Sequence, residues 1–204
     1  FDYLMLCRPN HQSIGDSIPE GKTLFSPNLS LILTDVTSYW QTYAAVYTSM
    51  RNTLINNKGV GGNTSAQILS RLSADVLSHS PRLVYLHAST NDYLGGGTPI
   101  SLAARTANIQ ACSDAINAAG ARGVLINAMY GTSTNSENPG LRDYMLDWWN
   151  NYRPSLTGEY ATADIMQPLL SGGYMADALT QSYKIHPTPA GYALIGPYIA
   201  ASLP

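Results

Sequence analysis

Charged side chains are scarce in this 204-residue sequence. Only 12% of the residues are Asp, Glu, Lys or Arg, and the formal net charge is −2, whereas about a quarter of an average chain is charged. There is no basic field or Lys/Arg cluster, so nucleic acids and membrane surfaces are poor partners for this protein. We therefore expect a neutral ligand and a surface built from Ser, Thr, Asn, Gly and Tyr.

Cysteines and long apolar runs are also rare. The two cysteines, Cys7 and Cys112, match no metal-ligand spacing, and we expect both to be buried free thiols. No cluster of His, Cys, Asp and Glu has the spacing of a metal site, so neither a metal nor another cofactor is predicted. No apolar run reaches the roughly 18 residues that a membrane-spanning helix needs, so membrane insertion is not expected.

The length suits one domain with a sizeable core, and residues 1–204 are interpreted as a single domain. The first residues, FDYLMLCRPNH, lack the basic start and the cleavage site of a secretory signal. The chain begins with Phe rather than Met, as a mature form or a domain excised from a larger protein would. The hydroxyl-rich, weakly charged composition favours an extracellular or virion-exposed location.

Apolar, β-branched segments alternate with helical patterns along the chain. This alternation indicates an α/β fold in which helices wrap a parallel sheet, with the active site at the carboxyl ends of the strands. The predicted elements are strand 53–57, helix 65–80, strand 82–89, helix 100–120, strand 122–129 and helix 186–203.

Four polar turns interrupt this pattern and carry chemically useful groups. GDSI at 15–18 presents a serine hydroxyl, and HP at 186–187 supplies an imidazole. NKGVGGNTS at 57–65 crowds glycines before a helix, where exposed backbone N–H groups favour negative charge. STND at 89–92 ends the strongest strand with a side-chain amide. A hydroxyl, a general base and convergent neutral donors are the parts of an acyl-transfer site.

In this order and at these spacings, the four turns resemble the sequence blocks of the SGNH hydrolases, also called the GDSL esterase/lipase family. The resemblance covers nearly the whole chain and implies a three-layer α/β/α sandwich with a flavodoxin-like parallel sheet. It also implies a serine esterase that cleaves carboxylic esters through an acyl-enzyme. By this resemblance Ser17 is the nucleophile and His186 is the general base and then the acid. The oxyanion hole is formed by the backbone N–H groups of Ser17 and Gly62 and by the side chain of Asn91.

The sequence departs from the family pattern in two of these turns. The family usually has Asp three residues before its histidine, but Tyr183 stands there. Three groups remain as alternatives for orienting His186: a backbone carbonyl, Asp177 or the Tyr183 hydroxyl. Ser89 also stands where the third block usually has glycine. We expect Asp16 to stabilise its own turn rather than to join the chemistry.

The substrate class is predicted from composition together with the range of the family. A neutral, hydroxyl-rich protein favours a carbohydrate O-acetylesterase that acts on an acetylated polysaccharide. A lipase or thioesterase is the alternative within the family, and a catalytically inactive carbohydrate-binding module is the alternative outside it. Flat faces for sugar rings are offered by aromatic residues, although those on helices are more often core. These residues are Trp40, Tyr93, Tyr130, Trp148 and Trp149.

Overall fold

The computed structural model describes residues 11–16, 55–95, 97–132, 138–180, 185–188, 190–191, 194–195 and 198, without the side chains of residues 11 and 55–57. The predictions made for Cys7, Ser17, Trp40 and Tyr183 lie outside the described residues.

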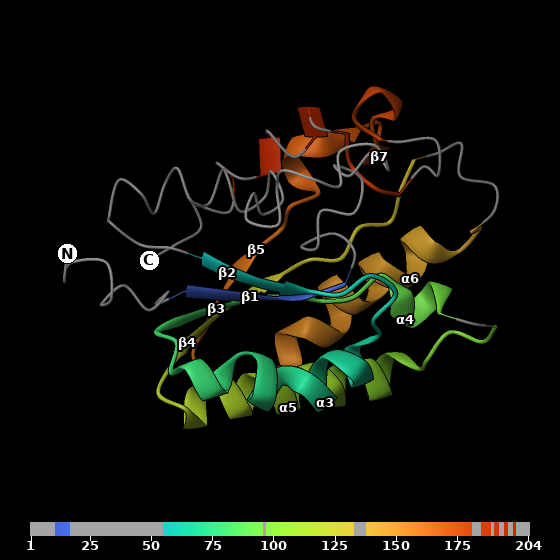
Figure 1. Cartoon of the computed structure of the whole chain (residues 1–204). Coiled ribbons are helices and arrows are strands. Elements are labelled where there is room, and N and C mark those ends of the chain that lie inside the picture. The colour runs from blue at the N-terminus through green and yellow to red at the C-terminus, as the bar shows by residue number, and fades with distance from the viewer. Residues whose placement is uncertain are drawn as a thin grey trace, which may run out of the picture.

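Five parallel strands form the central sheet (Figure 1). Across the sheet their order is β2-β1-β3-β4-β5, which is the flavodoxin-like order. The order reverses between β1 and β3, so a ligand site is expected outside the carboxyl ends of these two strands. The strands are β1 His11–Gly15, β2 Ile55–Gly59, β3 Leu83–His87, β4 Arg122–Ile126 and β5 Tyr160–Ala163.

Two helices, α3 (Ser65–Asp75) and α5 (Leu102–Ala118), cover one face of the sheet (Figure 1). α3 begins at a capping box, in which Thr64 and Gln67 each accept the other's backbone N–H. On α5, Cys112 is a buried free thiol, as predicted. Burial raises the pKa of this thiol to about 12, so it is unreactive in the folded chain.

The remaining elements are short and lie mainly in the C-terminal half. They are α4 Asn91–Leu94, α6 Leu141–Asp147, the π-helix Trp148–Tyr152, the hairpin of β6 Leu170–Ser171 and β7 Tyr174–Met175, and the 3₁₀ turns Leu77–His79, Arg153–Ser155, Gln167–Leu169 and Asp177–Leu179.

Each face of the sheet has its own hydrophobic core, because successive side chains of a strand point to opposite faces. Val84 of β3 packs with residues of α3 and α5. Its neighbour Tyr85 packs in the second core with residues of the C-terminal segment, including Ile185 and Ile195. The chain therefore forms the expected three-layer α/β/α fold. Among the described residues, no helix is both long enough and apolar enough to cross a membrane.

Two predicted helices differ from those observed. The helix predicted over 65–80 ends at Asp75 and continues as a 3₁₀ turn. The closing helix does not begin at His186, because Pro187 forms a β-bridge with Thr180. In the described part of this segment, helical residues begin at Ala190.

Candidate active site

The candidate site lies at the carboxyl edge of the sheet, where three turns follow three neighbouring strands. The first turn (residues 15–16) ends β1, the second (residues 60–64) follows β2, and the third (residues 89–91) follows β3. Because β1 lies between the other two strands, the three turns meet. The predicted nucleophile, Ser17, directly follows the first turn, and its role stays a prediction.

The carboxylate of Asp16 joins the first turn to the third. Asp16 is fully buried, and its Oδ2 accepts the backbone N–H of Thr90 at 2.9 Å and the Asn91 amide at 3.2 Å. The Ser89 hydroxyl also approaches this oxygen, at 3.4 Å. We expected Asp16 to stabilise its own turn. These bonds reach a turn more than 70 residues away in sequence, so the carboxylate also fixes how two loops of the site meet.

Asn91, a predicted oxyanion donor, lies between the first and second turns. Its Nδ2 is 3.2 Å from Asp16 Oδ2 and 3.2 Å from the carbonyl oxygen of Asn63. Both distances are at the long end of the usual range for N–H···O bonds. The amide is half-buried. In the free protein the amide hydrogens of Asn91 therefore already have two acceptors, both at long distances.

Gly62, the second predicted donor, stands at the exposed tip of the second turn. Its φ of +81° lies in the left-handed region, and a Cβ there would meet no atom within 4 Å. Glycine is thus favoured at position 62 because the backbone is left-handed there, and not because a side chain would clash. No residue in the described ranges accepts the Gly62 N–H, so this donor is open to a ligand.

Ser89 connects the second and third turns. Its hydroxyl donates to the Asn63 carbonyl at 2.5 Å and accepts the backbone N–H of Asn91 at 2.9 Å. The side chain is fully buried. The serine that replaces the usual glycine therefore supplies both a donor and an acceptor at the junction of the turns.

A buried ion pair holds the backbone of the third turn in place. The Arg105 guanidinium donates to the carbonyls of Ser89 at 2.6 Å and Ala88 at 3.0 Å, and it pairs with Asp92 at 2.8 Å. Burial lowers the pKa of Arg105, and the nearby Asp92 opposes this shift, so the guanidinium stays charged. Asp92 also accepts the Ser65 N–H at 2.7 Å, which ties the third turn to the start of α3. The sequence drew attention to Asn91 and did not single out this pair.

His87 is fully buried at the end of β3. Its Nδ1 is 3.4 Å from Asp16 Oδ1, but neither ring nitrogen makes a hydrogen bond. Burial lowers the pKa of His87 more than Asp16 raises it, and Arg105 lowers it further. The imidazole is therefore neutral.

The predicted general base, His186, lies next to a β-bridge within the C-terminal segment. Thr180 and Pro187 form an antiparallel β-bridge, and His186 directly precedes Pro187. Asp177 lies three residues before Thr180, with an exposed side chain. The roles of both residues stay predictions.

The aromatic residues considered for sugar binding divide into core and partly exposed ones. Trp148, Trp149 and Tyr130 are buried, and burial raises the pKa of Tyr130 to about 12. Tyr93, two residues after Asn91, is half-buried and packs against Tyr144 with ring centroids 5.4 Å apart. Of the described candidates, Tyr93 is the one that is not buried.

Comparison with known proteins agrees with this architecture. The sequence model of the GDSL-like lipase/acylhydrolase family matches residues 13–194. Among curated proteins, no sequence matches the chain.

Several solved structures have the same fold. A GDSL-like lipase from Bacteroides thetaiotaomicron is 17% identical, with 95% of this chain and 87% of that chain covered and a TM-score of 0.66. The psychrotrophic esterase EstA from Pseudoalteromonas sp. is 18% identical, with coverages of 95% and 96% and a TM-score of 0.67. A lipase/acylhydrolase from Enterococcus faecalis is 20% identical, with coverages of 94% and 93% and a TM-score of 0.70. At identities this low, the structural similarity shows the shared fold and nothing more. The family model, in contrast, matches most of the sequence, so the chain belongs to the GDSL-like lipase/acylhydrolase family.

Proposed function

We propose that the chain is a serine ester hydrolase and that its substrate is an acetylated polysaccharide. The observation that carries the proposal is the position of Asn91. Its amide nitrogen lies 3.2 Å from both Asp16 and Asn63, between the turn that precedes Ser17 and the turn that contains Gly62. An oxyanion hole requires donors from separate segments that are fixed before the reaction, and the position of Asn91 at this junction supports such a role.

In the proposed reaction the Ser17 hydroxyl attacks the ester carbonyl while His186 takes its proton. The C–O bond to the alcohol then breaks, and His186 returns the proton to the departing alcohol oxygen. Water attacks the acyl-enzyme in the same way and releases the acid. The negative carbonyl oxygen is stabilised by the N–H groups of Ser17 and Gly62. The Asn91 amide joins them by exchanging one of its long bonds for the stronger acceptor.

A backbone carbonyl or Asp177 is proposed to orient His186. The bridge between Thr180 and Pro187 supports Asp177, because it draws together two segments that are seven residues apart in sequence. Replacement of Asp177 by Asn should then reduce turnover by about 10⁴-fold, as loss of the orienting carboxylate does in serine proteases. An unchanged rate and pH profile would exclude Asp177 and leave a backbone carbonyl or the Tyr183 hydroxyl as the orienting group.

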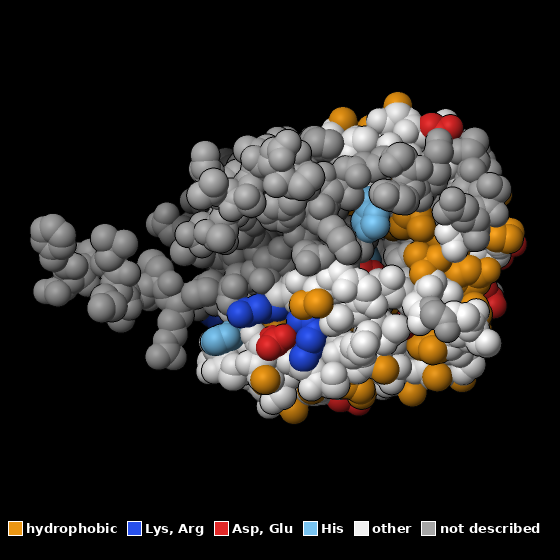
Figure 2. All heavy atoms as spheres, turned by 45° about the vertical axis from the view of Figure 1, so that its right-hand side comes forward, with side chains coloured by type: hydrophobic (Ala, Val, Ile, Leu, Met, Phe, Trp, Pro, Cys, Tyr) orange, Lys and Arg blue, Asp and Glu red, His pale blue; other side chains and the backbone are white. Residues whose placement is uncertain are grey.

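The choice of an acetylated glycan rests on the surface and on Tyr93. Figure 2 shows that much of the described surface is formed by uncharged polar side chains and backbone, with few charged groups. Tyr93, two residues after Asn91 in sequence, has a partly exposed side chain, and aromatic rings pack well against the apolar faces of sugars. The names of the structural neighbours, which include lipase, esterase and acylhydrolase, support longer acyl chains as the second candidate.

Hydrolysis of p-nitrophenyl esters from acetyl to palmitoyl, compared with Ser17→Ala and His186→Ala, tests both parts of the proposal. We expect a burst with the acetyl ester that is lost in both variants, and release of acetate from acetylated xylan. Preference for palmitoyl esters would instead support the lipase or thioesterase. A wild-type rate no higher than that of the variants would contradict the proposed hydrolase activity and favour a carbohydrate-binding module. Binding of the protein to the same acetylated xylan would then support that module.

A further inference from the structure

Arg71 lies on α3 and reaches three segments of the candidate site. Its guanidinium donates to the carbonyl oxygen of Gly15 at 2.8 Å, to that of Lys58 at 2.6 Å and to Asn63 Oδ1 at 2.6 Å. It also pairs with Asp75 at 2.9 Å, and the Arg71 side chain is only 17% exposed. One side chain therefore bonds to the end of β1, the end of β2 and the second turn.

Two of these acceptors adjoin the proposed backbone donors of the oxyanion hole. Gly15 is two residues before Ser17, and Asn63 directly follows Gly62. The Gly15 carbonyl also accepts the N–H of Val60 at 3.1 Å, so it joins the first turn to the second. Arg71 therefore binds to both the first and the second turn at positions next to or near the proposed donors.

We propose that Arg71 is a positioning residue that sets the distance between the first and second turns, and hence between the backbone donors of the oxyanion hole. The inference rests on the proposed ester hydrolysis. A guanidinium suits this role because it is planar and presents five N–H donors in a fixed fork, whereas the ammonium of lysine is a compact point charge. Its bonds are charge-assisted and about twice as strong as neutral ones.

The effect of Arg71 is expected in the rate of the chemical step. The hydrogen bonds of its guanidinium go to the protein itself, so substrate binding does not require it. A displacement of about 1 Å in a catalytic group can reduce the rate by about 10²-fold. Loss of the fork should therefore lower kcat while leaving KM and the pH profile unchanged.

The test compares Arg71→Lys with two control variants. Arg153→Lys alters another half-buried arginine. Its guanidinium donates to the Trp149 carbonyl at 2.9 Å and lies 4.6 Å from the centre of the Trp149 ring. Asp75→Asn removes the exposed ion pair and leaves the three bonds to the turns. We expect kcat for p-nitrophenyl acetate to fall about 10²-fold in Arg71→Lys and to stay near wild type in both controls.

Hydrogen exchange of the second-turn amides supplies a measurement that does not depend on catalysis. Measured well below the melting temperature of both proteins, these amides should exchange faster in Arg71→Lys than in wild type. Wild-type kcat in Arg71→Lys, or an equal loss in Arg153→Lys, would overturn the positioning role. A wild-type protein that hydrolyses no ester would contradict the proposed function itself. In that case faster exchange in Arg71→Lys supports the anchoring of the turns, and unchanged exchange overturns it.

Discussion

Ser89 provides a direct test of how the three turns are held together. Its buried hydroxyl donates to the Asn63 carbonyl at 2.5 Å and accepts the Asn91 N–H at 2.9 Å. We predict that Ser89→Ala weakens the connection between the third turn and the second. The Asn91 amide then loses its fixed position, so both stability and turnover should fall.

The size of the effect follows from the bonds that are lost. A hydrogen bond contributes a net of about 0.5–1.5 kcal/mol, and a buried group left without a partner costs about 1–3 kcal/mol. In Ser89→Ala the Asn63 carbonyl keeps its bond from Asn91 Nδ2. The backbone N–H of Asn91 is the group that loses its acceptor, the Ser89 hydroxyl. We expect a loss of about 2 kcal/mol in the free energy of unfolding, which lowers Tm by about 4–8 °C in a chain of this size. Turnover should fall about tenfold, less than the loss of a whole oxyanion donor.

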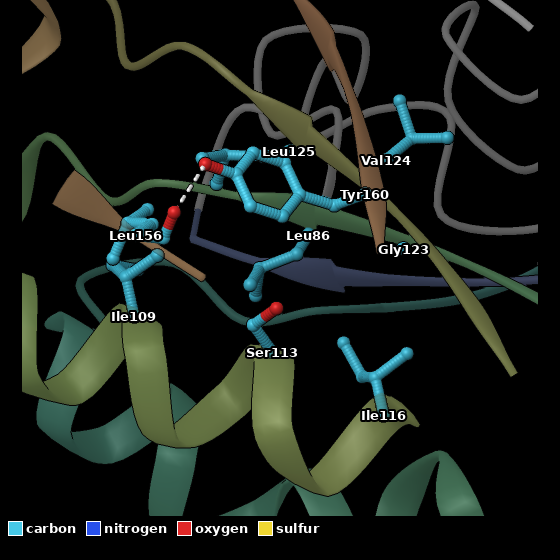
Figure 3. A pocket seen from close by; sticks show the side chains of 9 residues that line it. All are labelled: Leu86, Ile109, Ser113, Ile116, Gly123, Val124, Leu125, Leu156 and Tyr160. Atoms are coloured by element: carbon cyan, nitrogen blue, oxygen red, sulfur yellow. Dashed lines mark hydrogen bonds between the residues drawn. The ribbon is translucent and has the colours of Figure 1, made fainter. Parts of the chain in front are cut away.

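Thermal unfolding and the steady-state rate with p-nitrophenyl acetate measure the two effects. The matched control is Ser113→Ala on α5, because the Ser113 hydroxyl lies beside a small apolar cavity (Figure 3) and makes no hydrogen bond with the described residues. Ser113→Ala should leave both Tm and kcat nearly unchanged. Ser89→Gly should be less stable than Ser89→Ala by about 0.5–1 kcal/mol, because glycine makes the unfolded chain more flexible. If Ser89→Ala is as stable and active as wild type, the hydroxyl does not hold the turns.

Three further predictions concern neighbouring residues. Asn91→Ala should lower kcat by about 10²–10³-fold while the protein stays folded; a wild-type rate, measured beside a thermal melt, would remove Asn91 from the oxyanion hole. Arg105→Met leaves Asp92 as an unpaired buried charge and should cost about 3–5 kcal/mol in urea unfolding, whereas an unchanged urea midpoint would show that the pair is dispensable. Burial lowers the pKa of His87, so the unfolded chain binds the proton more readily, and the free energy of unfolding should decrease as the pH falls below about 6.5. His87→Gln should reduce the difference between urea midpoints at pH 7.5 and pH 5.5, and an identical difference would contradict a neutral buried His87.

The elements that could be predicted from the sequence are those with a strong apolar pattern. β3 and β4 are buried on both faces, and α5 buries Ile109, Cys112 and Ile116 at helical spacing. β1 carries no such pattern, because Gln12 and Ser13 stand in its middle, yet both are fully buried. This strand is paired on both sides, and backbone pairing of this kind leaves no mark in the spacing of apolar residues.

The candidate site was only partly predictable for a related reason. Gly62 and Asn91 occur in short local motifs, so the family resemblance was enough to single them out. Arg71 and Arg105 lie within helices, where an arginine is ordinary. Their importance depends on backbone carbonyls that are up to 56 residues away in sequence. Asp16 was noticed, but its partners on the third turn could not be inferred from the composition of its own turn.

The separation of these partners along the chain has a consequence for the order of folding. The bond from Arg71 to Gly15 spans 56 residues, and the bond from Thr90 to Asp16 spans 74. Contacts of this kind form late, because each requires a long loop to close first. During synthesis or refolding, helices α3 and α5 can gain structure before β1 and β3 have paired, but the three turns cannot yet meet. The return of the proposed esterase activity should therefore report completion of the sheet, and it should lag behind the return of helical signal.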